Sequence, residues 1–306
     1  MKLQEVLRNG EIPQIGFGPG SWGYSAKMKK QRKGISLLIY KVVNKLYLRP
    51  VGRKKYVNAV ACAFRMGYRL LDYSCAYSSP NLVAEGIKKS GVKREDIFIT
   101  TRISNRAQRE GKVRVREEFL RFLKTMEIEY VDLLQFHWPV TGCYLDTWKE
   151  MEKLKDEGYV KYLGVANCHQ HHLEEIFKIC KHRPEIGQFE IHPLFTQKPL
   201  IEYYKQQGIV VEAYTPVARY DDRLVRLPLL RRLGEKYKKN FIQIILRWHV
   251  QNGVIPIIRS HNEEHLASNL DIFDFNIEEE DMKAIDAINI NSRLRYDPDN
   301  CDFSIL

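Results

Sequence analysis

The feature that most constrains the fold is a regular alternation of short apolar runs with amphipathic stretches. After residue 55, seven apolar runs start 23 to 34 residues apart, with one wider gap of 45 residues. The runs are Tyr68–Asp72, Ile97–Arg102, Val131–His137, Val160–Asn167, Ile186–His192, Ile209–Pro216 and Val254–Ser260. They lack the alternation of apolar and polar residues that marks a half-exposed strand. We therefore expect strands buried on both faces, as in a parallel sheet.

Helix-like segments lie between these runs. In the segment Leu145–Gly158, apolar residues recur at every third position and a glycine ends the pattern, which predicts a helix. The segments Leu173–His182 and Pro199–Gly208 have the same character. Strands that alternate with helices predict right-handed βαβ units. With Ile15–Phe17 as the first strand the count reaches eight, the number that closes a (β/α)₈ barrel.

The predicted fold is therefore α/β, a single TIM-barrel domain over residues 1–306. The chain shows no linker and no low-complexity tract that would divide it. Near its start, the Asn9-Gly10 pair stands between two short apolar runs. Such a pair is typical of a tight hairpin turn, so we expect an N-terminal β-hairpin that caps the bottom of the barrel.

Composition excludes several classes of protein. The chain has 44% hydrophobic and 28% charged residues and no run of eighteen apolar residues, so no membrane-spanning helix is expected. The first residues have no apolar segment of a secretory signal. Six cysteines are scattered without a C-x-x-C pair, which disfavours a disulfide framework or a zinc finger. We expect a reduced protein of the cytoplasm.

The basic charge is concentrated in one segment, residues 23–55. The net charge is +11, and eleven Lys or Arg with no Asp or Glu lie between Lys27 and Lys55. Apolar residues from Ile35 to Leu46 follow a helical stripe. We favour a helix packed on the barrel with a solvated basic face. The alternatives are a subunit or partner interface and a surface that binds membranes or nucleic acid. Because the rest of the chain is formally neutral, we do not expect a nucleic-acid-binding protein.

Polar residues stand where the predicted strands end. In a barrel of this kind, the C-terminal ends of the strands meet on the face that carries the active site. These residues are Asp72 followed by Tyr77, Arg102, His137-Trp138, Asn167, Gln188 with Glu190, Tyr214 and Arg259-Ser260. The sequence predicts that they face one another.

The stretches around these residues resemble a known family. LLDYSCAY, FITTRISN, VDLLQFHWP, YLGVANC, GQFEIHP, EAYTP and IPIIRSHNEEHLASNL occur in this order and together resemble the aldo-keto reductases. The resemblance covers residues 11–22 and 56–300, and is greatest to smaller bacterial-type members such as the 2,5-diketo-gluconate reductases. It implies a nicotinamide-dependent oxidoreductase that reduces aldehydes, ketones or sugar carbonyls to alcohols.

The resemblance also implies the catalytic residues. The family's Asp, Tyr and His match Asp72, Tyr77 and His137, and Arg102 stands where the family has Lys. Tyr77 would protonate the carbonyl oxygen as general acid, and His137 would donate a hydrogen bond to that oxygen. A free Tyr titrates near pH ~10, so a nearby cation is needed to favour proton release. Arg102 keeps the charge, but its planar fork can pair with both oxygens of Asp72 and serve Tyr77 less well.

For the cofactor, the resemblance implies NADPH bound across the barrel mouth. Asn167 and Gln188 would bind the carboxamide, Tyr214 would stack on the nicotinamide, and Thr215, Pro216 and Val217 would line the pyrophosphate path. Arg259, Ser260, His265 and Asn269 match the site for the 2′-phosphate. Because His265 replaces an Arg, we expect NADH to bind with a smaller disadvantage than usual. Trp22 and Trp138, with His137, would form the substrate pocket for a small-molecule carbonyl compound.

Two further hypotheses remain open. With Arg102 at the Lys position, the protein could be a nicotinamide-binding sensor or subunit without turnover.

The second hypothesis is a metal site. His169, His171 and His172 follow a strand, and histidine is a common metal ligand. Only Cys168 is placed to complete such a group, so we expect a surface helix start there and no metal. We expect a monomer or a weak dimer, with residues 23–55 as a candidate interface.

Overall fold

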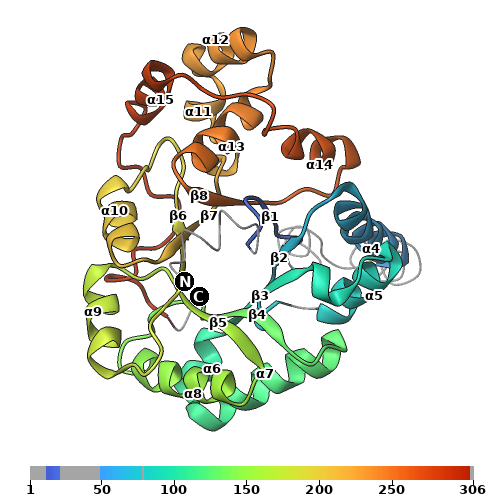
Figure 1. Ribbon diagram of the computed structural model, residues 1–306, viewed down its shortest axis with the longest axis vertical. Coiled ribbons are helices and arrows are strands. Elements are labelled where there is room, and N and C mark those ends of the chain that lie inside the picture. Colours follow the sequence, from blue (N-terminus) through green and yellow to red (C-terminus); the bar gives the residue numbers. More distant parts are fainter. Residues whose placement is uncertain (1–11, 21–48, 78, 304–306) are drawn as a thin grey trace, which may run out of the picture.

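Eight parallel strands close into a barrel in the computed structural model, which describes residues 12–20, 49–77 and 79–303 (Figure 1). Each strand pairs with its neighbours in the chain, and β8 returns to pair with β1, where Gly16 lies opposite Ile257. The strands are β1 (Gly16–Phe17), β2 (Leu70–Asp72), β3 (Phe98–Ile103), β4 (Val131–Phe136), β5 (Val160–Ala166), β6 (Ile186–Glu190), β7 (Val210–Tyr214) and β8 (Val254–Ile258).

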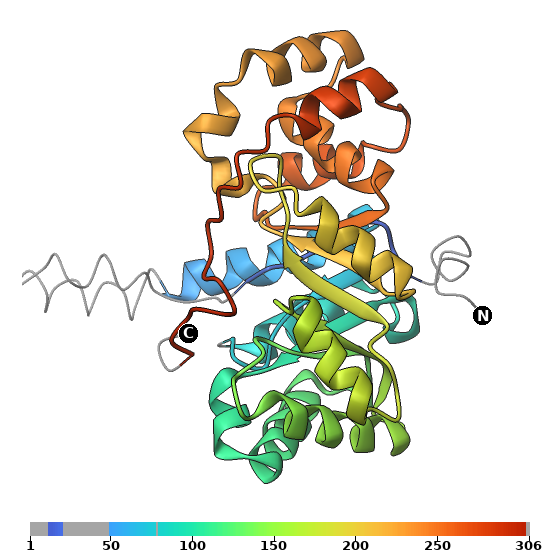
Figure 2. The ribbon, with the colours of Figure 1, turned by 90° about the vertical axis from the view of Figure 1, so that its left-hand side faces the viewer.

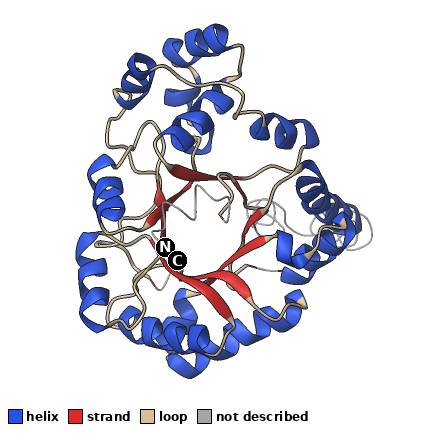
Figure 3. Cartoon of the chain, in the orientation of Figure 1, coloured by secondary structure: helices blue, strands red, loops and turns tan. Residues whose placement is uncertain are grey.

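Helices surround this ring of strands (Figure 3). They are α4 (Arg49–Met66), α5 (Pro80–Ser90), α6 (Asn105–Glu110), α7 (Lys112–Met126), α8 (Tyr144–Asp156), α9 (Gln170–Ile179), α10 (Lys198–Gln206), α11 (Asp222–Val225), α12 (Pro228–Tyr237), α13 (Phe241–Gln251), α14 (Glu263–Leu270) and α15 (Glu279–Asp286). The short 3₁₀ helices are η2 (Arg94–Asp96) and η3 (Ala218–Tyr220).

Both faces of the strands are buried, which explains the absence of alternation in the sequence. Every residue of β3 and of β4 is buried. The outer faces pack against the helices in one large apolar cluster, and a smaller cluster with Ile12 and Leu70 lies inside the barrel. Close packing is visible at Gly187 of β6, where an added Cβ would lie 2.0 Å from the ring of Tyr204 on α10. Any larger residue there would displace that helix.

The predicted fold class is confirmed, and each predicted strand overlaps an observed one. The predicted hairpin at Asn9-Gly10 and the helical stripe from Ile35 to Leu46 lie outside the described residues. Residues 49–55, the end of the predicted insertion, form the first turns of α4 rather than part of a separate element. Arg53 there is exposed and pairs with Glu85 at 2.8 Å. No helix within the described ranges is long and apolar enough to cross a membrane.

The segment after α15, residues 289–303, is here called the C-terminal segment. Figure 2 shows it in red, running along one end of the barrel. The backbone N–H groups of Leu294 and Arg295 donate to the two carboxylate oxygens of Glu190 at 2.7 and 2.9 Å. Glu190 is buried at the end of β6, so this contact fixes the segment to the face where the strands end.

Candidate active site

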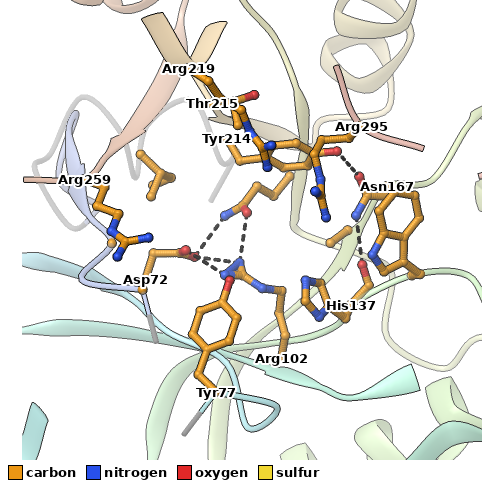
Figure 4. Close-up of a pocket in the computed structure, with 16 residues that line it drawn as sticks. Asp72, Tyr77, Arg102, His137, Asn167, Tyr214, Thr215, Arg219, Arg259 and Arg295 are labelled. Atoms are coloured by element: carbon orange, nitrogen blue, oxygen red, sulfur yellow. Dashed lines mark hydrogen bonds and ion pairs between the residues drawn. The ribbon is translucent and has the colours of Figure 1, made fainter. Parts of the chain in front are cut away.

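The C-terminal ends of the strands surround a cavity of about 230 Å³ (Figure 4). Side chains from β2, β3, β4, β5, β6, β7 and β8, or from the loops after them, reach it. The predicted site residues that line it are Asp72, Tyr77, Arg102, His137, Trp138, Asn167, Gln188, Tyr214, Thr215 and Arg259. The structure therefore brings together residues that are far apart in the sequence, as the barrel predicts.

A buried ion pair forms the floor of this cavity. The two terminal nitrogens of Arg102 donate to the two carboxylate oxygens of Asp72, each at 2.6 Å. Both side chains are nearly inaccessible, at 3% and 9% exposed. Burial raises the pKa of Asp72, whereas the charge of Arg102 opposes this shift. The bidentate geometry is the one that the Arg side chain favours with a carboxylate, and it confirms the pairing expected from the sequence.

Gln188 connects this pair to a second buried carboxylate. Its carbonyl oxygen accepts from Arg102 at 2.9 Å, and its amide nitrogen donates to Asp72 at 3.0 Å and to Glu212 at 2.9 Å. Glu212, on β7, is fully buried. Burial raises the pKa of Glu212 to about 7, and the nearby charge of Asp72 contributes to this shift as the second cause. The amide of Gln188 thus bonds three side chains in the floor of the site.

Tyr77 and His137 stand together above this floor. Their rings lie edge to face with centroids 6.3 Å apart, and Tyr77 contacts Tyr73 in the same way at 5.3 Å. Within the described part of the chain, the hydroxyl of Tyr77 has no hydrogen-bond partner, so it can face a ligand. Burial lowers the pKa of His137 to about 3, and the charges of Arg102 and Arg295 add to this effect. His137 is therefore neutral near pH 7 and can act as a hydrogen-bond donor.

Asn167 and Tyr214 form an adjoining wall. The Asn167 amide donates to the carbonyl of His137 at 2.9 Å, and its oxygen accepts from the hydroxyl of Tyr214 at 2.6 Å. Asn167 has a left-handed backbone with φ 58°, which asparagine tolerates better than most residues. This conformation ends β5 and directs the amide toward His137.

The loop after β7 is strained. Thr215, Ala218, Arg219 and Tyr220 all have φ between 48° and 60°, a region that costs energy for residues with a Cβ. Such strain concentrates at functional sites, where the surrounding structure maintains it. The hydroxyl of Thr215 is buried without a hydrogen-bond partner among the described residues. Pro216 and Val217 follow in the same loop but do not line the cavity.

The predicted phosphate-site residues lie after β8. Arg259 lines the cavity, and its guanidinium lies against Gly20, where an added Cβ would come within 2.9 Å. Ser260 and His265 lie outside the cavity, around the start of α14, and His265 is exposed. Asn269 is buried on α14, where the carbonyl of the nearby Leu266 accepts a hydrogen bond from the Tyr68 hydroxyl at 3.1 Å. Of these residues, only Arg259 lines the cavity that holds the catalytic groups.

Comparison with known proteins shows what kind of protein has this site. The model of the "Aldo/keto reductase family" matches residues 43–290. The chain belongs to the aldo/keto reductase family. It is an enzyme of the oxidoreductase class, and the resemblance found in the sequence is confirmed.

Relatives of this reductase support the assignment. This chain is 40% identical over 246 residues to a glyoxal reductase of Bacillus subtilis, and the match covers 80% of this chain and 88% of that protein. It is 38% identical over 244 residues to a 9,11-endoperoxide prostaglandin H2 reductase of Trypanosoma cruzi, covering 79% of this chain and 86% of that protein.

Solved structures of the family share the barrel. An aldo-keto reductase from a Medee basin deep-sea metagenome library superposes with a TM-score of 0.83 at 30% identity, covering 96% of this chain and 98% of that one. The aldo-keto reductase of Bombyx mori, solved in complex with NADP, gives a TM-score of 0.77 at 28% identity, covering 94% and 92%. This likeness supports a nicotinamide cofactor.

Sequence reasoning missed two arginines of the reductase. Arg219, in the strained loop, and Arg295, in the C-terminal segment, both line the cavity. No local pattern distinguishes them from surface arginines, since neither lies at the end of a strand. Trp22, predicted as a pocket wall, lies outside the described residues, whereas Trp138 is buried beside the cavity and packs near Phe303.

The histidine cluster also differs from expectation. α9 starts there as predicted, with His169 as its N-cap. The expectation that only Cys168 could complete a group is wrong, because Asp299 of the C-terminal segment contacts all three histidines, at 2.7, 3.3 and 3.7 Å. The Nδ1 atom of His172 accepts a bond from the backbone of His169, so its Nε2 carries the proton that a metal would have to displace. The contact ties the C-terminal segment to α9.

Proposed function

We propose that this protein reduces the carbonyl group of aldehydes, ketones or sugars to an alcohol, with NADPH as the hydride source. The observation that carries the proposal is the free hydroxyl of Tyr77 beside a neutral His137, above the Arg102–Asp72 pair. The glyoxal reductase relative supports a small carbonyl substrate.

Each residue has a distinct task in this mechanism. Neutral His137 donates a hydrogen bond to the carbonyl oxygen and orients the substrate, and this bond strengthens as negative charge develops there. Tyr77 delivers the proton to the same oxygen. Arg102 supplies a fixed positive charge below Tyr77 that favours release of that proton. Asp72 and Gln188 hold the guanidinium in place.

The residues present fit a nicotinamide cofactor. The unpartnered hydroxyl of Thr215 and the guanidinium groups of Arg219 and Arg259 offer hydrogen-bond donors for phosphate oxygens. Within the described residues, neither arginine is paired with a carboxylate. The ring of Tyr214 offers a stacking surface. When bound, the cofactor supplies the hydride.

The remaining cofactor residues are assigned by resemblance. Asn167 and Gln188 would hold the carboxamide, sharing amides that already bond within the site. Pro216 and Val217 would border the pyrophosphate. Ser260, His265 and Asn269 would join Arg259 around the 2′-phosphate, with NADPH preferred and NADH accepted less well. We also propose a cytoplasmic location, which the six unpaired cysteines support. We propose a monomer or a weak dimer as the oligomeric state.

A second candidate is a nicotinamide-binding sensor or subunit without turnover. One observation favours it. Both terminal nitrogens of Arg102 are bonded to Asp72, and no described hydrogen bond links this guanidinium to Tyr77. In this case Tyr77 lacks the direct contact with a cation that a Lys would give.

Two measurements separate the candidates. NADPH oxidation is followed at saturating cofactor with a panel of glyoxal, methylglyoxal, simple ketones and keto-sugars, and NADPH binding is titrated by fluorescence. Turnover of at least one carbonyl compound, with the alcohol identified as product, supports the reductase. Cofactor binding without turnover of any panel member supports the sensor and rejects the reductase.

A further inference from the structure

Arg295 lines the cavity from the C-terminal segment and has no role in the proposed proton transfer. Its backbone is fixed by Glu190, and its side chain lines the cavity together with His137, Trp138 and Tyr214. Figure 4 shows the guanidinium entering the cavity on the side of His137 and Asn167. The charge of Arg295 contributes to the lowered pKa of His137. The guanidinium of Arg295 therefore lies close to His137, which binds the carbonyl oxygen in the proposed mechanism.

The guanidinium of Arg295 has no carboxylate partner among the described residues. Its Cζ atom lies 5.6 Å from the ring centroid of the neighbouring Tyr296. By contrast, Arg293 two residues earlier lies over the ring of Phe195 and reaches His169, and it does not line the cavity. A half-buried guanidinium with unused donors is a site for an oxyanion, since the Arg fork matches carboxylate and phosphate groups.

The other cations of the cavity are placed differently. Arg102 is paired with Asp72 in the floor, so its terminal nitrogens are already bonded. Arg259 lies on the Asp72 side of the cavity and Arg219 beside Thr215, as Figure 4 shows. We have assigned both to the phosphates of the cofactor. Among the described arginines that line the cavity, Arg295 is thus the one left to bind the substrate.

We propose that Arg295 binds an oxyanion group on the substrate, so that the preferred substrates are anionic carbonyl compounds such as oxo acids. This inference rests on the proposed function and deepens it. The C-terminal segment then determines specificity, because Glu190 and the contact of Asp299 with α9 hold the backbone of this segment beside the cavity that the Arg295 side chain lines. Neutral aldehydes would be reduced by the same catalytic groups without this contact.

The test compares matched anionic and neutral substrates in wild type and variants. The pairs are glyoxylate with methylglyoxal, for a carboxylate, and glyceraldehyde 3-phosphate with glyceraldehyde, for a phosphate. Arg295→Met is expected to lower the anionic-to-neutral ratio of kcat/KM by about 10- to 100-fold for the preferred oxyanion. Arg295→Lys is expected to keep much of the preference. Arg293→Met, which removes the same charge from the same segment, should leave the ratio within about threefold of wild type.

A binding measurement keeps this proposal separate from the reductase proposal. Oxamate, a non-reacting carboxylate, and its neutral analogue oxamide are titrated calorimetrically into the wild type and Arg295→Met with saturating NADP⁺. Binding of oxamate that is lost in Arg295→Met supports the oxyanion site even if no carbonyl compound is reduced. Reduction of neutral aldehydes with unchanged substrate ratios and no Arg295-dependent oxamate binding overturns it, while the reductase function stands. The absence of both turnover and oxamate binding overturns both proposals.

Discussion

Arg102 binds Asp72 through two parallel hydrogen bonds of 2.6 Å, at the position where related reductases are expected to carry a Lys. A guanidinium in this geometry is held rigidly and stays charged, since Arg does not lose its proton in proteins. The charge remains below Tyr77, but both terminal nitrogens face the carboxylate. This pair therefore keeps a positive charge near Tyr77. It limits the help that Arg102 can give to proton transfer by Tyr77, because its terminal nitrogens are bonded to Asp72.

Replacing Arg102 with Lys should change turnover. An ammonium group cannot make the bidentate pair, so it is freer to contact Tyr77. We expect kcat to rise by roughly tenfold or its pH profile to shift, because proton transfer by the acid is the step that the cation assists. The measurement is kcat against pH from 5 to 9. Unchanged kcat together with an unchanged profile would show that the Arg side chain is equivalent to Lys here.

The same pair should matter for stability. Arg102→Met leaves the buried carboxylate of Asp72 without its partner, and such losses destabilise by about 3–5 kcal/mol. Urea unfolding at pH 7 measures the loss. Arg53→Met, which breaks the exposed pair with Glu85, is the control and should hardly change the midpoint. Equal effects of the two variants would contradict a structural role for the buried pair.

Glu212 should make stability depend on pH. Burial, with Asp72 second, raises its pKa from an ordinary 4.5 to about 7. Between these values the native state holds a proton that the unfolded state has lost, so the free energy of unfolding falls as pH rises from 4.5 to 7. In Glu212→Gln this dependence is removed.

The measurement for Glu212 is urea unfolding between pH 5 and 8. The stability of wild type relative to Glu212→Gln is expected to fall over this range by up to ~3 kcal/mol. Glu85→Gln, at an exposed site, is the control and should keep the wild-type slope. Parallel pH curves for wild type and Glu212→Gln would refute the assignment.

His265 should limit the preference for NADPH. An Arg at this exposed position near the start of α14 would add a permanent charge toward the 2′-phosphate. We expect His265→Arg to raise the ratio of NADPH to NADH affinity by about tenfold. Fluorescence titration of both cofactors gives the two Kd values. If wild type binds NADPH and NADH equally, the assignment of this site is wrong.

The sequence predicted those parts of the site that follow local rules. Asp72, Arg102 and Asn167 stand at or beside the ends of apolar runs, and parallel closure alone brings such ends to one face. Arg295 follows no such rule. Its place depends on hydrogen bonds to Glu190, 105 residues earlier in the chain. Asp299 reaches His169 across 130 residues for the same reason.

Glu212 shows a different limit of sequence reasoning. It lies within an apolar run, where alternation is absent and the direction of a side chain cannot be assigned. Only the register of β6 with β7, which pairs Gln188 with Glu212, reveals that this carboxylate lies in the floor of the site. The raised pKa follows from that placement and from no property of the sequence around it.

The measurement that tests the central claim most directly is NADPH oxidation by Tyr77→Phe beside wild type, with cofactor binding measured for both. The substitution removes one hydroxyl and keeps the ring that packs on Tyr73 and His137. We predict a loss of kcat of at least about 100-fold, the scale of general acid catalysis, with NADPH affinity unchanged. Turnover by Tyr77→Phe at the wild-type rate would contradict the account.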